Sequence, residues 1–260
     1  MPTVDVNGAR LWYDEAGSGP AVLLVHGGLG DSGLWEPVVP FLADRFRVIR
    51  TDLRFYGRST GPIVPFSWQE DVVGVLDQLG LERAALVGLS MGGRLVLDVA
   101  LAHPERVWAL AHVAGGLGGH DSAAYTEADE TRYETAIKAG ELEAAMDVEL
   151  EVWAPLGATE RIQALWYATP DANGLPWDLE PLRPAGAPAK ERLGELAVPT
   201  LVVTVSHDPP GHREAGLVVA REAPDARHVE LDSDHYVTLR EPELLARVLL
   251  EFLTATAPQE

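Results

Sequence analysis

The stretch Gly88-Leu89-Ser90-Met91-Gly92 decides the fold of this chain. It follows the strand-like apolar run Ala84–Val87 and precedes a helix-like run from Arg94 to Ala102. Glycines two positions before and two positions after the serine let the chain reverse sharply from strand to helix without side-chain collision. The pattern therefore predicts a strained turn, a nucleophile elbow, that exposes the hydroxyl of Ser90 above a sheet edge at a helix N-terminus.

Two backbone N–H groups are expected to face a carbonyl group bound beside this serine. The N–H of Met91 and the dipole of the following helix would face negative charge that develops on the carbonyl oxygen. The stretch from His26 to Asp31, HGGLGD, also follows a strand-like run, and its glycines let the backbone approach a ligand closely. The N–H of Leu29 is therefore the expected second donor. The alternative is a tight glycine turn that binds nothing.

A serine hydroxyl is a weak nucleophile and needs a base within hydrogen-bond reach, which in turn needs a carboxylate to orient it. His235 is the best placed of the eight histidines, because it follows the last strand-like run and precedes the last helix. Asp208 likewise follows an apolar run, Leu201–Val205. Both side chains are expected at the sheet edge that carries Ser90. The alternatives are a surface histidine and an aspartate that forms a turn before Pro209-Pro210.

The same residue types could also form a metal site, from Asp208 with His207, His212 and His235. No two of these histidines are four residues apart, which is the spacing that places two ligands on one helix face. The sequence therefore predicts no metal site.

Short apolar runs alternate with helical patterns along the chain, which is typical of a mostly parallel sheet with helices on both faces. The first two runs are close enough to form an antiparallel hairpin. Eight strands are expected, at Val4–Val6, Leu11–Tyr13, Ala21–His26, Arg47–Asp52, Ala84–Leu89, Val107–Val113, Thr200–Val205 and Arg227–Leu231. Helices are expected at Trp68–Leu79, Arg94–Ala102, Glu214–Ala223 and after Glu241, where Pro242 occupies the first turn.

One segment breaks this alternation. Too many residues for a single crossover lie between Val113 and Thr200, and Leu142–Trp153 and Ile162–Trp166 show helical periodicity. From Gly118 to Lys190 the segment carries 14 Asp and Glu against 5 Lys and Arg, so it would repel an anionic substrate. We expect a core domain of residues 1–117 and 193–260 and an inserted helical cap of residues 118–192, with Asn173–Pro188 as a loop that returns to the core.

The composition excludes several classes of protein. The formal net charge is −20, so neither nucleic acid nor an anionic membrane is an expected partner, because both require a basic face. No apolar run approaches the roughly 18–20 residues of a membrane span, and the N-terminus lacks the pattern of a signal peptide. We therefore expect a cytoplasmic protein. The absence of cysteine excludes disulfides, thiolate zinc sites and cysteine nucleophiles.

Taken in order, the motifs resemble those of the α/β-hydrolase-fold serine hydrolases. The matching stretches are His26-Gly27-Gly28, Asp52-Leu53-Arg54 with Gly57-Arg58-Ser59, Gly88–Gly93, His207-Asp208 and Asp234-His235, and they cover nearly the whole chain except the cap. The resemblance implies an α/β-hydrolase fold and no cofactor. It implies Ser90 as nucleophile, Asp208 as acid, His235 as base, and Leu29 and Met91 as donors of an oxyanion hole.

The chain departs from the usual pattern of this family at two positions. Phe55 replaces the first glycine of the common Asp-x-Arg-Gly-x-Gly pattern, which predicts a reshaped and more apolar pocket. Asp234 stands where a glycine usually precedes the histidine. Its carboxylate would help to hold an imidazolium, perturb the pKa of the base, or point to solvent. The residues expected to line the substrate pocket are His26, Gly28, Phe55, Trp153 and Trp166.

The sequence predicts an enzyme that cleaves a neutral, moderately apolar carboxylic ester or lactone, with this small-molecule substrate as its partner. The family motif occurs in carboxylesterases, enol-lactone hydrolases, perhydrolases and carbon–carbon bond hydrolases, so it leaves the substrate and the oligomeric state open. The alternatives are a carbon–carbon hydrolase, lyase or cyclisation catalyst that uses the same residues for proton transfer, and a ligand-binding protein of this fold without activity.

Overall fold

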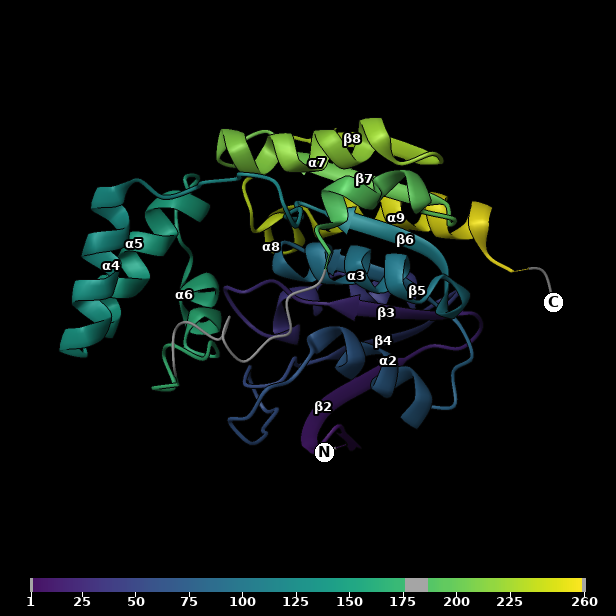
Figure 1. The fold of residues 1–260 in the computed structure, drawn as a ribbon, viewed down its shortest axis with the longest axis horizontal. Coiled ribbons are helices and arrows are strands. Elements are labelled where there is room, and N and C mark those ends of the chain that lie inside the picture. The colour runs from purple at the N-terminus through teal and green to yellow at the C-terminus, as the bar shows by residue number, and fades with distance from the viewer. Residues whose placement is uncertain (1, 176–186, 259–260) are drawn as a thin grey trace.

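A central eight-stranded sheet organises the computed structural model, which describes residues 2–175 and 187–258 (Figure 1). The strand order is β1-β2-β4-β3-β5-β6-β7-β8, and all pairs are parallel except β1 with β2 and β2 with β4. The strands are β1 (Thr3–Val6), β2 (Ala9–Ala16), β3 (Ala21–Val25), β4 (Arg47–Thr51), β5 (Ala84–Leu89), β6 (Val107–Val113), β7 (Thr200–Val205) and β8 (Ala226–Leu231). The predicted mostly parallel sheet is confirmed, with β2 longer than expected.

Helices cover both faces of this sheet, because the central strands are apolar on both sides. Along β5, for example, Leu86 packs into the core on one face and Val87 into the core on the other. The first core also contains residues of α2 (Trp68–Gln78), α3 (Met91–Ala102) and α7 (Pro210–Glu222), and the second contains residues of α1 (Val39–Leu42), α8 (Val237–Arg240) and α9 (Pro242–Thr256).

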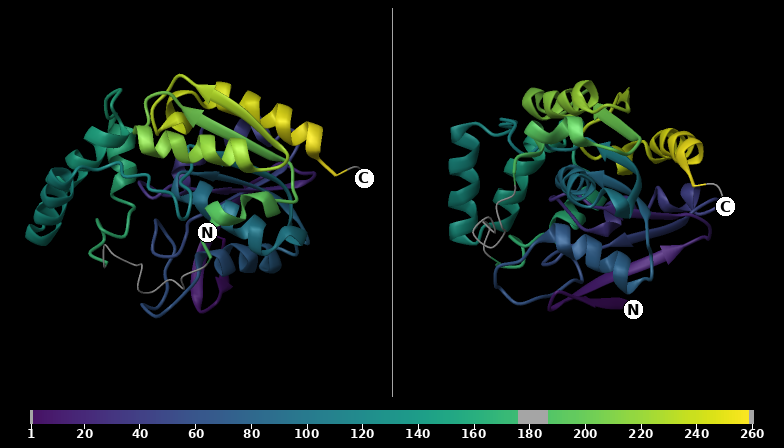
Figure 2. Two further views of the ribbon diagram at one scale, coloured as in Figure 1. Left: turned by 45° about the horizontal axis from the view of Figure 1, so that its top comes forward. Right: turned by 45° about the vertical axis from the view of Figure 1, so that its right-hand side comes forward.

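Three further helices, here called the cap helices, lie beyond the ends of the strands (Figure 1): α4 (Glu127–Ala139), α5 (Leu142–Trp153) and α6 (Glu160–Trp166). Figure 1 shows them on the side to which the arrowheads of β3 and β6 point, and both views in Figure 2 keep them at that end of the molecule. The cap helices therefore face the carboxyl ends of the parallel strands, where the predicted site residues lie.

Helix α4 was not among the helices expected from the sequence. It is strongly polar, so its apolar periodicity is weak, and of its residues only Ala136 is buried. Its start nevertheless carries a readable signal, a capping box in which Thr126 and Asp129 satisfy each other's backbone N–H groups.

The predicted division into a core and a cap of residues 118–192 stays a prediction. Most of the expected return loop Asn173–Pro188 lies outside the described residues. Among the helices that the structure describes, none is long and apolar enough to cross a membrane.

Candidate active site

The turn at Ser90 has the strained geometry that the sequence predicted. Ser90 lies between β5 and α3 with φ of 56° and ψ of −118°, a backbone conformation that non-glycine residues rarely adopt. A side chain at either flanking glycine would collide with backbone: a Cβ atom on Gly88 would lie 2.2 Å from Gly92 O, and one on Gly92 would lie 2.5 Å from His26 O. The two glycines are therefore required by close backbone approach at this turn.

Asp208 and His235 meet at the same sheet edge, after β7 and β8 respectively. Nδ1 of His235 lies 2.9 Å from Oδ1 of Asp208, and both side chains are buried. Because an ionised carboxylate only accepts hydrogen bonds, the proton of this bond is on Nδ1, and in the neutral imidazole Nε2 then has the free lone pair. Within the described residues Nε2 of His235 is buried without a hydrogen-bond partner. It is therefore free to accept a proton from a group that enters the site.

His212, in the first turn of α7, links this pair to the serine turn. Its Nε2 donates to Ala114 O over 2.8 Å, and its ring centroid lies 5.1 Å from that of His235. Close by, the N–H of Gly116 donates to Ser90 O over 3.3 Å. Burial, followed by the proximity of His235, lowers the pKa of His212 to about 4, so this imidazole is neutral at physiological pH.

The backbone of the glycine-rich stretch lies against the serine turn. A Cβ atom on Gly27 would lie 3.1 Å from Cβ of Ser90, and one on Gly28 would lie 3.7 Å from Sδ of Met91. The stretch that contains Leu29 and the turn that contains Met91 are thus neighbours, as an oxyanion hole built from both would require.

His26 holds this stretch in place instead of facing the solvent. Its Nε2 accepts from the N–H of Leu53 over 2.9 Å, so its Nδ1 carries the proton and donates to Gly27 O over 2.8 Å. The ring is fully buried, and this burial lowers the pKa of His26. The predicted pocket residue His26 therefore fixes the backbone beside Ser90, as a neutral side chain with both nitrogens engaged.

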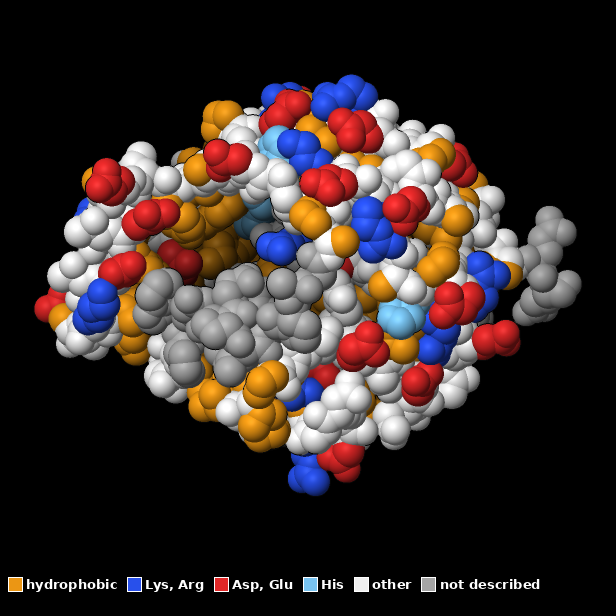
Figure 3. Space-filling view, in the orientation of Figure 1, with side chains coloured by type: hydrophobic (Ala, Val, Ile, Leu, Met, Phe, Trp, Pro, Cys, Tyr) orange, Lys and Arg blue, Asp and Glu red, His pale blue; other side chains and the backbone are white. Residues whose placement is uncertain are grey.

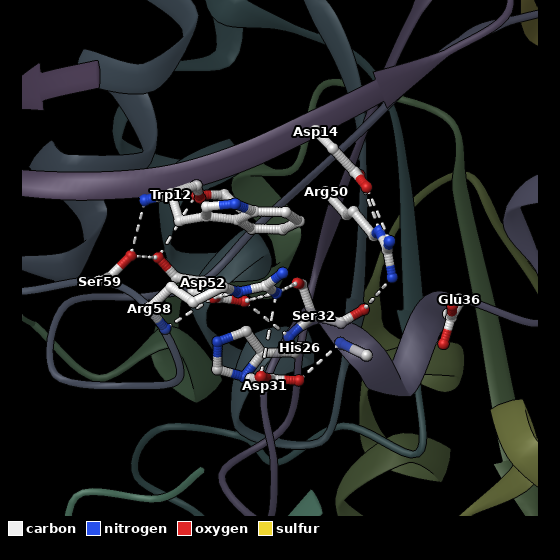
Figure 4. A network of polar contacts seen from close by, with 12 residues as sticks. Trp12, Asp14, His26, Asp31, Ser32, Glu36, Arg50, Asp52, Arg58 and Ser59 are labelled. Carbon is white, nitrogen blue, oxygen red and sulfur yellow. Dashed lines mark hydrogen bonds and ion pairs between the residues drawn. The ribbon is translucent and has the colours of Figure 1, made fainter. Parts of the chain in front are cut away.

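A buried polar network around Asp52 supports the same region (Figure 4). Asp52 accepts from the N–H of Ser32 and from the backbone and guanidinium of Arg58, whose guanidinium also stacks on Trp12 at 3.2 Å. Burial by itself would raise the pKa of Asp52, but the hydrogen bonds from Arg58 and the proximity of His26 hold it below its usual range. The motif Asp52-Leu53-Arg54 with Arg58 thus anchors the loop that carries His26.

The two predicted pocket tryptophans occupy different places in the cap. Trp153, at the end of α5, lies directly over the imidazole of His235, with ring centroids 4.3 Å apart. Trp166, at the end of α6, is fully buried, and its indole N–H donates to Glu149 of α5. The structure therefore brings Trp153 to His235, whereas Trp166 is connected to Trp153 through Glu149 and Tyr125.

Phe55 adopts a positive φ of 76°, which explains why glycine is the usual residue at this position. Its ring is 5% exposed and packs edge-on against Phe66, with centroids 5.4 Å apart. The ring belongs to the hydrophobic core on one face of the sheet. Its expected role in the substrate pocket stays a prediction.

Asp234 does not point to solvent, and the hydrogen bonds observed for its carboxylate come from groups other than the imidazole. The carboxylate is buried, forms an ion pair with Arg240, and accepts from the N–H of Leu156 in the segment after α5. Arg240 in turn donates to Gly157 O over 2.6 Å. This departure from the family pattern therefore ties the cap segment 156–157 to the core beside His235.

Two residues in this region were not singled out by the sequence. His212 appeared only as part of a discounted metal site, yet Asp208, His212 and His235 have potential ligand atoms within 4.8 Å of one another. Of the atoms that could bind an ion, Nε2 of His212 and Nδ1 of His235 already form the hydrogen bonds described above. Glu149 was counted only as cap charge. Its spacing four residues before Trp153 places a carboxyl on the apolar face of α5, and this was the signal that could have found it.

Comparison with known proteins identifies the family. Residues 20–242 match the alpha/beta hydrolase fold family. The chain belongs to this family. The hydrolase is 30% identical to a putative carbamate hydrolase of Azorhizobium caulinodans, with 97% of this chain and 98% of the relative covered.

Two other similar proteins extend this comparison. The hydrolase is 28% identical to a 2-hydroxy-6-oxo-6-phenylhexa-2,4-dienoate hydrolase of Comamonas testosteroni, covering 96% of this chain and 93% of the relative. Its fold matches the solved structure of an N-acyl homoserine lactone degrading enzyme with a TM-score of 0.78 and 25% identity, covering 96% of this chain and all of the other. These relatives differ in the bond they are named for, so they support a hydrolase without fixing its substrate.

Proposed function

We propose that this hydrolase cleaves a neutral, moderately apolar carboxylic ester or lactone through an acyl-enzyme on Ser90. The observation that carries the proposal is the buried contact of 2.9 Å between His235 Nδ1 and Asp208 Oδ1, which leaves Nε2 of His235 free at the edge that carries the strained Ser90 turn.

In the first half-reaction the hydroxyl oxygen of Ser90 attacks the carbonyl carbon, while its proton passes to Nε2 of His235. Asp208 keeps the proton on Nδ1 and stabilises the imidazolium that forms. When the tetrahedral intermediate collapses, the bond to the alcohol oxygen breaks and His235 returns the proton to that oxygen. The geometry supports this order because Asp208 and His235 are both held by burial.

The negative charge of the tetrahedral intermediate would be bound by the N–H groups of Leu29 and Met91. The adjacency of Gly27 and Gly28 to Ser90 and Met91 supports this assignment. The N-terminus of the 12-residue helix α3 adds its dipole at the same place. In the second half-reaction a water molecule attacks the acyl carbon while His235 takes its proton; the bond to the Ser90 oxygen then breaks, His235 returns the proton to that oxygen, and the acid is released. The proposed steps use only these side chains and backbone groups, and no cofactor.

The similarity to a lactone-degrading enzyme and to a carbamate hydrolase supports an acyl-transfer reaction. Figure 3 shows a hollow between the cap and the core with mainly hydrophobic walls, which suits a moderately apolar substrate. The net charge of −20 disfavours an anionic one.

A second candidate reaction is hydrolysis of a carbon–carbon bond. It is favoured by the similarity to the dienoate hydrolase of Comamonas testosteroni. In that case Ser90 and His235 would move protons onto and off the substrate, water would add to its carbonyl carbon, and the bond from that carbon to the neighbouring carbon would break, with a proton taken up by the carbon that leaves.

The deciding experiment combines active-site labelling with a substrate panel. A fluorophosphonate probe should label the wild-type protein at Ser90. It should not label Ser90→Ala, and it should label Asp208→Asn much more slowly than wild type. Turnover should be found among p-nitrophenyl esters of graded acyl length and small lactones, and Ser90→Ala should reduce it by several orders of magnitude. Ester turnover within about tenfold of wild type in Ser90→Ala would overturn the acyl-enzyme. Turnover of a vinylogous diketone substrate alone would favour the carbon–carbon reaction.

A further inference from the structure

Glu149 is a carboxyl group placed inside the cap, where a surface charge is not expected. It lies on the apolar side of α5, accepts from the hydroxyl of Tyr125 over 3.3 Å, and accepts from the indole of Trp166. Burial, and next the charge of Asp171, raise the pKa of Glu149 to about 7, although the hydrogen bond from Trp166 works against this shift. Ionisation of Glu149 at this apolar position is unfavourable unless a polar or charged partner compensates for the lost hydration.

Asp171, in the segment after α6, is a second carboxyl, and its charge acts on Glu149. It accepts from the hydroxyl of Tyr133 of α4, and burial raises its pKa as well. Neither Glu149 nor Asp171 forms an ion pair with any lysine, arginine or histidine in residues 2–175 and 187–258. The cap thus carries two partly buried carboxyl groups whose charges affect each other, without a compensating cation among the described residues.

Tyr236, in the core after β8, carries a buried polar group. The hydroxyl of Tyr236 is buried and has no hydrogen-bond partner within the described residues. Burial, followed by the charge of Glu149, raises the pKa of Tyr236, so this hydroxyl lies within electrostatic reach of the same carboxyl. A buried hydroxyl without a partner is costly, and it is satisfied when a polar ligand group binds beside it.

These groups are connected to the catalytic base through Trp153. The indole N–H of Trp153 donates to the Tyr125 hydroxyl over 2.5 Å, and its ring lies over His235. Tyr125 and Trp153 also contact each other edge to face, with centroids 6.1 Å apart. A cationic group held between aromatic rings and carboxylates is stabilised both by charge and by the ring faces. In Figure 3 the hydrophobic hollow between cap and core also exposes acidic and histidine side chains.

We propose that Glu149 and Asp171, with the hydroxyls of Tyr125, Tyr133 and Tyr236, form a subsite that binds a protonated amino group of the substrate. The inference rests on the proposed ester or lactone hydrolysis and changes one part of it: the ester or lactone group that is cleaved is neutral, but the remote end of the substrate carries an ammonium group. The ammonium supplies three N–H donors and the positive charge that the two carboxyl groups lack.

Binding to this subsite depends on pH through Glu149. The titratable groups around Glu149 are Tyr125 before α4, Tyr133 of α4, Asp171 after α6 and Tyr236 of the core. The Asp234–Arg240 ion pair acts on Tyr236. His235 and His212 both contact Trp153. Because the ionised carboxylate binds the cation, affinity for an ammonium rises as the pH rises through about 7. Between pH 6 and pH 8 the ionised fraction grows about tenfold, and affinity should follow it.

The test measures binding by calorimetry to protein with Ser90→Ala, so that no turnover is needed. The probes are 2-phenylethylammonium and 2-phenylethanol, which have nearly the same size and differ in charge. At pH 8 the ammonium should bind at least about tenfold more tightly than the alcohol, which corresponds to about 1.4 kcal/mol. At pH 6 most of this preference should be lost, while the affinity of the alcohol stays constant.

Two variants and a matched control assign the effect to the subsite. Glu149→Gln and Asp171→Asn each keep a hydrogen-bonding side chain but remove a charge. In each variant the affinities for the ammonium and the alcohol should differ by less than about threefold. Glu151→Gln is the control, because Glu151 is on the same helix but is exposed and paired with Arg132. It should leave the preference for the ammonium unchanged.

Turnover gives a second measurement. The p-nitrophenyl esters of 6-aminohexanoate and heptanoate differ only in an ammonium or a methyl group at the remote end, and wild type should prefer the former in kcat/KM. Equal binding of the two probes at pH 8, or an ammonium preference that survives in Glu149→Gln and Asp171→Asn, would overturn the subsite. Failure of the proposed function looks different, because ester turnover would then be absent while the ammonium still binds.

Discussion

The indole of Trp153 lies over the imidazole of His235, with the two ring centroids 4.3 Å apart. This contact joins the last turn of the cap helix α5 to the loop after β8. Trp153 also contacts His212, at a centroid distance of 5.0 Å. The cap thus contributes directly to the position of the proposed base, and the surroundings of His235 depend on cap and core together.

Truncation of the Trp153 side chain should therefore lower the activity, although Ser90 itself is unchanged. We expect Trp153→Ala to reduce kcat/KM for a p-nitrophenyl ester by about 100-fold, because the base is no longer held from the cap side. Trp153→Phe keeps an aromatic ring over His235 but loses the hydrogen bond to Tyr125, and it should cost less than about tenfold. Equal activity of the Ala and Phe variants would show that the ring contact does not position the base.

The two aspartates near His235 should give opposite results. Asp208→Asn should lower kcat by about 10⁴-fold with little change in melting temperature, because the wrong tautomer of His235 is then favoured. Asp234→Asn should retain most of the activity per folded molecule but unfold more easily, by about 3 kcal/mol, because it leaves Arg240 without its buried partner. Steady-state kinetics and chemical denaturation of both variants measure the two effects. The reverse ranking in kcat would mean that Asp234 is the carboxylate that orients the base.

Phe55 allows backbone strain to be separated from packing. Phe55→Ala should lower the free energy of unfolding by about 3–5 kcal/mol, because a buried ring is lost and the positive φ remains. Phe55→Gly loses the same ring but relieves the strain, so it should be more stable than Phe55→Ala by about 1 kcal/mol.

Phe66 provides the matched control for this comparison, since its φ is not positive. Phe66→Gly should have a free energy of unfolding lower than that of Phe66→Ala by roughly 0.5–1 kcal/mol, because glycine loses more backbone entropy on folding than alanine. Urea denaturation of the four variants measures the difference. A broadened preference for acyl length in Phe55→Gly would establish the pocket role that the sequence predicted, and an unchanged profile would exclude it.

Because of Glu149, the free energy of unfolding should decrease as the pH is raised from about 4.5 to about 7. Its pKa rises from 4.5 to about 7 on folding, so in this interval the unfolded state has already released the proton that the folded state still holds. The cost above pH 7 is on the order of 3 kcal/mol. Glu149→Gln should therefore stabilise the protein more at pH 8 than at pH 5, as measured by urea denaturation at both values. A stability difference that does not vary with pH would mean that Glu149 is ionised in the folded state throughout.

Much of the fold could be predicted from the sequence because its signals are local. Parallel strands buried on both faces appear as short apolar runs, and the glycines around Ser90 are required by contacts within one turn. The same local reasoning placed Ser90, Asp208 and His235 after three parallel strands of one sheet, β5, β7 and β8. Helix α4 escaped it, since a polar helix has weak periodicity and its capping box was the only strong signal.

The partners of the charged side chains depended on the tertiary structure alone. Asp234 meets Leu156, 78 positions away in the chain, and Arg240, so its role in tying the cap to the core had no trace in the local pattern. Glu149 looks in the sequence like one more acidic residue of an acidic segment. Its burial between Tyr125 and Trp166 gives it a pKa of about 7. Electrostatic energies depend on burial and on neighbours within a few ångströms, and folding brings those neighbours from distant parts of the chain.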